Sequence, residues 1–177
     1  MTVTYDQLVD LWGPTNLIHF PIRELLSVIE FGPDALPPDG AMPIEVPILF
    51  TAAVSDGGIE LFTQLKLDIA GRPSMRLIVI GAVPADQKML YAVDAASGGV
   101  VLVDVEEPTV EVVNSTFAIF VEFLYRVGQL IQNDPGGVER ARRAQALRAE
   151  LVELDPLAFG DPQSWWSIAF DQLLASR

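Results

Sequence analysis

The feature that most constrains the fold is a change in the spacing of apolar residues along the chain. Near both ends they recur every three to four residues, which is the period of an amphipathic helix. Between about residues 47 and 113 they alternate with polar residues, as in half-buried strands. The connections between these strands are too short for parallel crossovers. The pattern predicts an α+β fold around a central, mostly antiparallel sheet.

About six strands are expected in this sheet. They cover residues 47–53, 59–69, 75–82, 88–94, 100–105 and 109–113. Residues 95–99 (Ala-Ala-Ser-Gly-Gly) have the composition of a hairpin turn. Residues 33–43 contain four prolines and one glycine, which predict a loop without regular structure.

Two helices are expected before the sheet and about three after it. Thr4 and Gln7 have the spacing of a capping box, so a helix should follow over residues 5–12. Pro21 should open a second helix that ends at Gly32-Pro33, with Ile22, Leu25, Leu26 and Ile29 on its inner face. No linker or repeat divides the chain, so one domain over residues 1–177 is expected.

The helices after the sheet also carry local start signals. Asn114 or Ser115 should cap a helix whose inner face holds Phe117, Phe120 and Leu124. Asp134-Pro135 and Asp161-Pro162 should open the last two helices, because proline is favoured in a first helical turn. Trp165 and Trp166 are expected to pack in the core. A ligand-stacking platform is the less favoured interpretation of this pair.

Net charge limits the possible partners. The chain has 24 acidic and 11 basic residues, a net charge of -13. This charge repels nucleic-acid backbones and anionic membranes, and it attracts basic partners. No apolar run approaches the roughly 20 residues of a membrane span, and the first residues do not resemble a signal peptide. We therefore expect a cytoplasmic protein that binds neither nucleic acid nor membrane.

The sequence shows no constellation for catalysis, metal or cofactor binding. His19 is the only histidine and cysteine is absent, so zinc and cysteine-nucleophile sites are excluded. Because His19 lies between Ile18 and Phe20, we expect a packed residue rather than a general base. Phosphate-binding loops, serine elbows and calcium loops are also missing. A pair of carboxylates of the glycosidase type stays open, because acidic residues are plentiful.

The charged residues are unevenly distributed. The basic cluster, Arg140, Arg142, Arg143 and Arg148, is expected on a solvated helix face with Glu139 as a local ion-pair partner, and phosphate binding is the minority interpretation. Two acidic groups are candidate partner-binding residues. The first is Asp34, Asp39, Glu45, Asp56 and Glu60, and the second is Glu106, Glu107 and Glu111. They either maintain solubility or dock against a basic protein cleft, such as the substrate groove of a nuclease.

Four short motifs appear in a characteristic order. They are Phe31-Gly32-Pro33, the segment 94–101 (DAASGGVV), the segment 113–116 (VNST) followed by Phe117 and Phe120, and the segment 155–158 (DPLA) followed by Asp161-Pro162 and Trp165-Trp166. Together, over about residues 20–175, they resemble the SUKH superfamily of bacterial immunity proteins, and within it the fourth family. Pro33 stands where the family pattern has leucine.

This resemblance implies a function. Proteins of this kind neutralise a cognate secreted toxin, often a nuclease or a deaminase, by binding it inside the producing cell. We expect this chain to occlude the active site of such a toxin and to be a monomer when unbound. The alternative is an acidic cytosolic adaptor or a secretion-chaperone-like protein, which would present a large apolar groove and dimerise.

Overall fold

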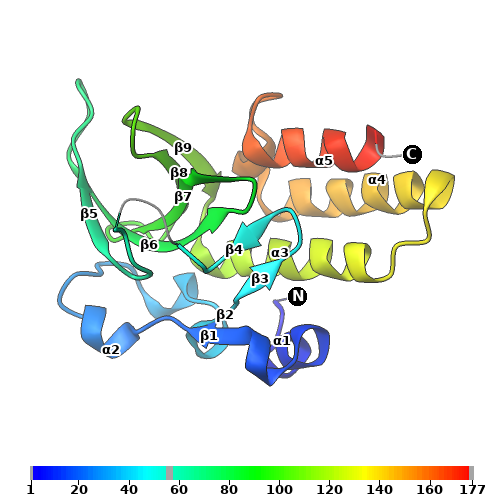
Figure 1. Cartoon of the computed structure of the whole chain (residues 1–177), viewed down its shortest axis with the longest axis horizontal. Helices are drawn as coiled ribbons and strands as arrows, with labels where there is room; N and C mark the ends of the chain where they lie inside the picture. Colours follow the sequence, from blue (N-terminus) through cyan, green and yellow to red (C-terminus); the bar gives the residue numbers. More distant parts are fainter. Residues whose placement is uncertain (1, 55–57, 176–177) are drawn as a thin grey trace.

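The alternating residues form a seven-stranded antiparallel sheet at the centre of the computed structural model, which describes residues 2–54 and 58–175 (Figure 1). Its strand order is β3-β4-β6-β7-β8-β9, and β5 pairs with β6 beside this path. The strands are β3 (Glu45–Val46), β4 (Phe50–Thr51), β5 (Gln64–Leu67), β6 (Met75–Val83), β7 (Asp86–Asp94), β8 (Val100–Asp104) and β9 (Thr109–Asn114). The α+β prediction is therefore confirmed, and β6 to β9 lie where four of the six expected strands were predicted.

The turn between β7 and β8 forms as predicted. The carboxylate of Asp94 accepts hydrogen bonds from the backbone N–H of Ala96 (3.0 Å) and the hydroxyl of Ser97 (2.8 Å). Gly98 adopts a φ of +77°, and a Cβ on it would lie 2.8 Å from the Cβ of Ala35. Glycine is needed here both for the backbone conformation and for the contact with the loop that contains Ala35.

Two of the predicted strands are wrong in extent. Residues 47–53 do not form one strand, because Ile48 has a φ of +63° and reverses the chain into the hairpin of β3 and β4. Residues 59–63 stay outside β5, since Phe62 has a φ of +65° and packs its ring edge-on against Phe20. The close approach of β4 to β6 requires Gly81, whose Cβ would lie 2.4 Å from the Phe50 ring.

The proline-rich loop is more regular than predicted. It contains two 3₁₀ turns, η2 (Pro33–Ala35) and η3 (Pro38–Gly40), followed by β2 (Ala41–Pro43). β2 pairs with β1 (Leu17–His19) in a separate two-stranded antiparallel sheet. Local composition does not reveal β2, because its partner strand β1 lies more than twenty residues earlier in the chain.

The capping box of the first helix, α1 (Tyr5–Trp12), is confirmed. The Thr4 N–H donates to the Gln7 side chain (2.9 Å), and the Gln7 N–H donates to the Thr4 hydroxyl (3.3 Å). The second helix is much shorter than predicted, because α2 spans only Ile22–Leu25 and Leu26 is 63% exposed. The chain leaves this helix so that the Glu30 N–H can donate to the carbonyl of Ala95 in the β7–β8 turn.

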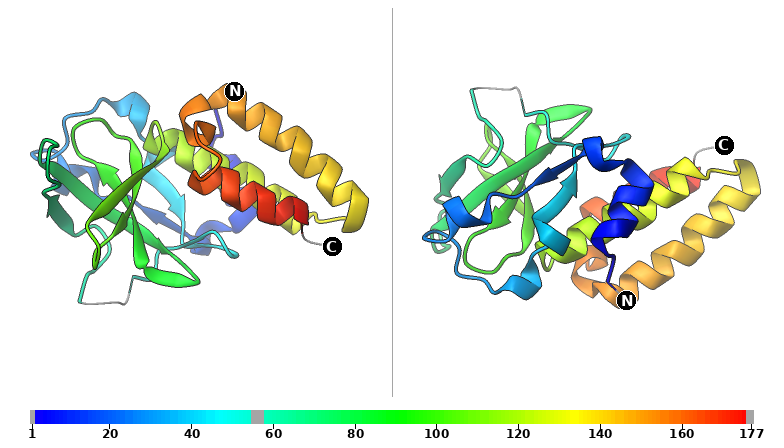
Figure 2. Two further views of the ribbon diagram at one scale, coloured as in Figure 1. Left: turned by 90° about the horizontal axis from the view of Figure 1, so that it is seen from above. Right: turned by 90° about the horizontal axis from the view of Figure 1, so that it is seen from below.

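The three helices after the sheet begin slightly later than predicted. They are α3 (Phe117–Gln132), α4 (Gly137–Leu154) and α5 (Trp165–Ala175), with 3₁₀ turns η1 (Pro14–Asn16) and η4 (Pro156–Phe159) elsewhere. Thr116, rather than Asn114 or Ser115, caps α3 by accepting a hydrogen bond from the Ile119 N–H (3.1 Å). Figure 2 shows α4 and α5 side by side, with α1 on the opposite side of α3. None of the described helices is long and apolar enough to span a bilayer.

The main core lies between α3 and one face of the sheet. Phe120 is 1% exposed, and its ring centroid lies 5.2 Å from that of Tyr91 and 5.9 Å from that of Phe50. Trp166 is also buried and contacts Phe123, as predicted for a core tryptophan. The other face of the sheet carries a smaller apolar cluster around Leu77 and Val101, against which β5 packs.

Candidate protein-binding surface

The first acidic group lies along the segment that leads into the sheet. Asp34 lies in η2, Asp39 in η3 and Glu45 in β3, and all three side chains are exposed. Glu60 is exposed in the turn before Phe62, whose ring packs against Phe20. Asp56 lies outside the described residues.

The second acidic group lies in the β8–β9 turn and on β9, the outermost strand of the sheet on the side away from β3, which holds Glu45. Glu106 and Glu107 are exposed in the β8–β9 turn, and Glu106 pairs with Lys88 (2.7 Å). Glu111 is half-buried, and its carboxylate accepts a hydrogen bond from the Trp165 N–H at the start of α5 (2.6 Å). That position is favourable for a negative charge, since the N-terminal N–H groups of a helix lack partners within it. Glu111 therefore has a structural contact that sequence spacing did not reveal.

Most basic residues form ion pairs with acids that belong to neither group. The paired bases are Lys66, Arg76, Lys88, Arg126, Arg140, Arg142, Arg143 and Arg148, and their partners are Asp68, Glu30, Glu106, Glu122, Glu150, Asp134, Glu139 and Asp171. These eight acids offset these eight bases, so the net charge of -13 resides on the other residues. Among the described residues, the side chains of Asp34, Asp39, Glu45, Glu60 and Glu107 have no ion-pair or hydrogen-bond partner.

The arginine cluster forms the predicted ion pairs on α4. Glu139 accepts hydrogen bonds from Arg142 and Arg143, which lower the pKa of its carboxyl to about 2. Arg140 instead binds Asp134 before the helix and lowers the pKa of that carboxyl. Arg148 reaches Asp171 on α5 and lies over the ring of Phe159. Arg140 and Arg148 therefore connect α4 to its neighbours, whereas Arg142 and Arg143 pair within the helix.

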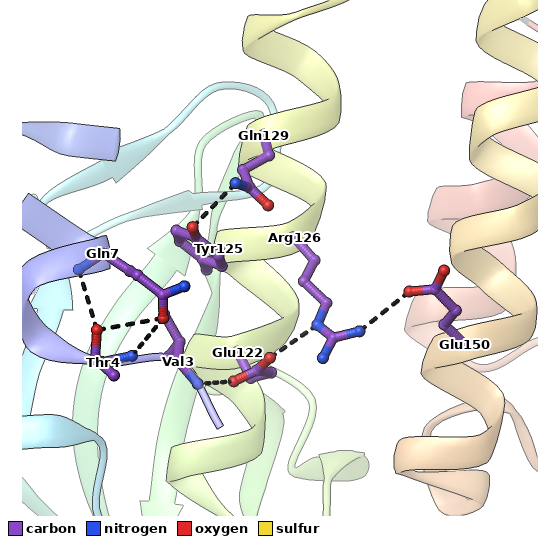
Figure 3. Close-up of polar contacts among 8 residues, drawn as sticks. All are labelled: Val3, Thr4, Gln7, Glu122, Tyr125, Arg126, Gln129 and Glu150. Carbon is purple, nitrogen blue, oxygen red and sulfur yellow. Dashed lines mark hydrogen bonds and ion pairs between the residues drawn. The ribbon is translucent and has the colours of Figure 1, made fainter. Parts of the chain in front are cut away.

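Two carboxylates, those of Glu122 and Glu150, line a cleft between the N-terminal segment, α3 and α4, and Arg126 lies in it with them. Glu122 is 4% exposed on α3 and accepts hydrogen bonds from the Val3 N–H and from Nε of Arg126 (2.8 Å). Arg126 also binds Glu150 of α4 (3.2 Å), as Figure 3 shows. Both carboxylates thus serve as partners of one arginine and hold the N-terminal segment, α3 and α4 together.

The structure corrects the expectation that His19 is packed in the core. Its side chain is exposed at the end of β1, with Nδ1 3.0 Å from the carbonyl oxygen of Asp39 and its ring beside Tyr5. A general base works together with a partner group that it activates or protonates, and this carbonyl and the Tyr5 ring are not groups of that kind. No group of three His, Cys, Asp or Glu residues in the described ranges could hold a metal ion.

The β3–β4 hairpin carries the most unusual exposed residue. Ile48 at its tip is 65% exposed and has a φ of +63°. Positive φ is unfavourable for a β-branched residue and costs about 1–3 kcal/mol. The hairpin therefore holds an apolar side chain in solvent in a strained conformation, and the sequence carried no signal for this.

The hairpin lies between two clefts. The larger, which we call the Trp12 cleft, is a cavity of about 440 Å³ between the hairpin, the end of α1 and α3. It is lined by Leu11, Trp12, Asn16, Glu45, Pro47, Gly128, Ile131 and Gln132. The smaller cleft, of about 180 Å³, lies on the Ile48 side and contains the Asp134–Arg140 ion pair. The structure thus brings Glu45, one of the predicted site residues, into a concave surface with residues distant in sequence.

Two of the four sequence motifs meet in a buried hydrogen-bond network. The Asn114 side chain accepts from Nε1 of Trp166 (2.9 Å) and donates to Asp155 (3.1 Å). The same Asp155 oxygen accepts from the Ser115 N–H (2.8 Å). The other two motifs also contact each other, since Phe31 packs against Gly98 of the β7–β8 turn. The motifs are therefore parts of the fold.

A family model, the SUKH-4 immunity protein family, matches residues 3–172. The chain belongs to this family. The match covers all four motifs and nearly the whole sheet-and-helix arrangement, so the resemblance drawn from the motifs is confirmed. Comparisons with curated proteins and with solved structures found no match. Membership assigns this SUKH-4 protein to an immunity family.

Proposed function

We propose that this SUKH-4 protein neutralises a nuclease or deaminase toxin in the cytoplasm of the producing cell by covering the toxin's active site. The observation that carries the proposal is the set of unpaired acidic side chains Asp34, Asp39, Glu45 and Glu60. Enzymes that act on nucleic acids present basic clefts to the phosphate backbone, and an acidic protein surface complements such a cleft.

The first acidic group suits this role better than the second. Glu106 is paired with Lys88 and Glu111 with the start of α5, so two of the three residues of the second group would lose an existing contact on binding a toxin. Asp39 and Glu60 have no such contact to lose. The backbone near both residues is also held in place. The Phe20 N–H donates a hydrogen bond to the carbonyl of Gly40, next to Asp39, and the Phe20 ring packs against Phe62, two residues after Glu60. A surface that is ordered before binding loses less conformational entropy on association.

The test is the association rate with the toxin encoded beside this gene, measured at low and high salt. Reversing two charges, Asp39→Lys with Glu60→Lys, should lower the association rate about tenfold at low salt, because charge complementarity steers encounter. The melting temperature should change little, since both side chains are exposed. The difference from the wild type should shrink at high salt, where screening shortens the range of the field to a few ångströms.

The matched control reverses Glu107 and Glu153, which are also exposed but lie in the β8–β9 turn and on α4. It changes the net charge by the same amount and should lower the rate much less. Equal effects of the two double variants would show that only net charge matters, and would contradict the proposed surface. A free chain that elutes as a stable dimer in light-scattering chromatography would favour the chaperone-like alternative over a monomeric inhibitor.

A further inference from the structure

The Trp12 cleft is large enough to receive a side chain. Its volume of about 440 Å³ lies within the range of small-molecule pockets, roughly 300–1,000 Å³. Gly128 of α3 contributes no side chain to the lining, and a Cβ there would lie 3.4 Å from Nε1 of Trp12. Glycine in the interior of a helix is unfavourable. A Cβ at this distance would make an ordinary van der Waals contact, so the glycine leaves space in the cleft and is not required for the approach of α1.

The charge of the cleft indicates a cation. Glu45 is the only charged residue among those that line it, and its carboxylate has no partner in the described chain. The amide oxygens of Asn16 and Gln132 are further acceptors on the lining. An incoming cation would therefore find a carboxylate and neutral acceptors, and no competing base.

The aromatic residue favours arginine over lysine. Trp12 is the aromatic residue of the lining, and tryptophan binds cations on its ring more strongly than the other aromatic residues do. A guanidinium is planar, stacks on aromatic rings and has five N–H donors, whereas an ammonium is compact and strongly hydrated. A lining that contains both a carboxylate and an indole matches the first of these groups.

The β3–β4 hairpin supplies an apolar contact next to the cleft. Pro47 lines the Trp12 cleft, and the following residue, Ile48, is the exposed and strained tip. Interfaces between proteins commonly combine an apolar contact of this kind with an arginine in a neighbouring pocket. The arrangement fits a protein surface better than a free small molecule.

We infer that the Trp12 cleft receives an arginine side chain of the toxin, held by Glu45 and Trp12 while Ile48 contacts the adjacent apolar surface. The inference rests on the proposed function. It identifies Glu45 as the member of the first acidic group that makes a specific contact with the toxin. Other members of the first acidic group then steer the approach of the toxin, and Glu45 binds it.

The test uses the indole N–H signal of Trp12 in a ¹H–¹⁵N NMR spectrum, assigned by its loss in Trp12→Phe. The probe is N-acetyl-arginine amide, and N-acetyl-citrulline amide is its uncharged analogue. The Trp12 signal should shift in a saturable manner with the arginine probe and not with the citrulline probe. Glu45→Gln should weaken probe binding about two- to fivefold, the size expected for an exposed ion pair. The matched control Glu107→Gln should titrate as the wild type does.

Three results would overturn the inference: a Trp12 signal unmoved by the arginine probe, an equal shift with citrulline, or an unchanged titration in Glu45→Gln. The inference would also be overturned if, in the absence of probe, the Trp12 signal shifted as the protein concentration was raised. A second copy of the chain would then occupy the cleft. The probe experiment is independent of the toxin. Probe binding in a chain that fails to bind the toxin would therefore contradict the proposed function alone. Toxin binding with an inert cleft would contradict the inference alone.

Discussion

At the scale of single residues, buried polar side chains join separate elements through hydrogen bonds, and exposed ones remain available to a partner. Asn114 is fully buried and uses its amide to join Trp166 and Asp155, and Glu122 is buried between Val3 and Arg126. Glu45 has no partner in the described chain. The sequence predicted a helix cap at Asn114 or Ser115 and a binding role for Glu45, but it did not predict which polar side chains would be buried, because burial depends on what surrounds each side chain.

Replacing Asn114 by alanine should destabilise the fold by about 1–3 kcal/mol, because the Trp166 N–H would stay buried without an acceptor. The measurement is a urea titration followed by tryptophan fluorescence. Asn133→Ala is the control, since its side chain makes only an exposed hydrogen bond to the carbonyl of Gln129, and it should cost less than about 1 kcal/mol. Equal losses would show that the network is not a significant source of stability.

Tyr91 should make stability fall at alkaline pH. Burial, together with the charge of Glu111, raises the pKa of its phenol well above 10 in the folded state. The unfolded chain loses this proton near pH 10 while the folded chain keeps it, so the contribution of Tyr91 is complete below pH 10 and decreases as pH rises above it. The decrease in melting temperature from about pH 9.5 to 11 should be smaller in Tyr91→Phe. Parallel curves for the two proteins would contradict this, whatever the offset caused by losing the hydrogen bond to Leu49.

At the scale of elements, long amphipathic segments formed as predicted and short ones depended on their neighbours. α3 buries an apolar face that runs from Phe117 to Gly128, as its period predicted. α2 stops after four residues because Glu30 bonds to the β7–β8 turn instead of continuing the helix. Helix period alone could not anticipate that competition, since the competing carbonyl of Ala95 is far away in the chain.

Truncating Phe120 to alanine should cost about 3–5 kcal/mol, because it leaves a cavity between α3, Tyr91 and Phe50. Chemical denaturation measures the change in the free energy of unfolding. Ile168→Ala on α5 is the matched helical control, since that side chain is 37% exposed, and it should cost much less. A loss below about 1 kcal/mol for Phe120→Ala would mean that this face of α3 is not central to the core.

At the scale of the whole molecule, the residues that form ion pairs are different from the acids that carry the net charge. The bases pair largely with acids that are not predicted site residues, and most of the other described acids are exposed, although Asp155 is buried. Such a distribution attracts a basic partner from a distance and also makes the free chain repel itself. Attraction and self-repulsion have the same origin, so both can be measured through their response to salt.

The melting temperature should rise by about 2–5 °C when NaCl increases from about 10 to 150 mM, because screening weakens repulsion among the unpaired acids. Differential scanning fluorimetry measures the shift. The double variant Asp39→Asn, Glu60→Gln has two fewer unpaired charges and should show a smaller rise. A melting temperature that falls with salt would mean that the ion pairs outweigh the repulsion.

The sequence by itself determined the fold class, the positions of β6 to β9, the capping box of α1, the inner face of α3 and the acidic excess. The acidic excess is a property of the composition. The other features depend on residues that are close together in the sequence, where periodicity and capping chemistry act. Tertiary structure decided the pairing of β1 with β2, the strained hairpin at Ile48, and the contact of Glu111 with the start of α5. It also assembled the Trp12 cleft from α1, β3 and α3. These features require backbone and side-chain partners that lie tens of residues apart, and local patterns carry no information about which distant partner a group will meet.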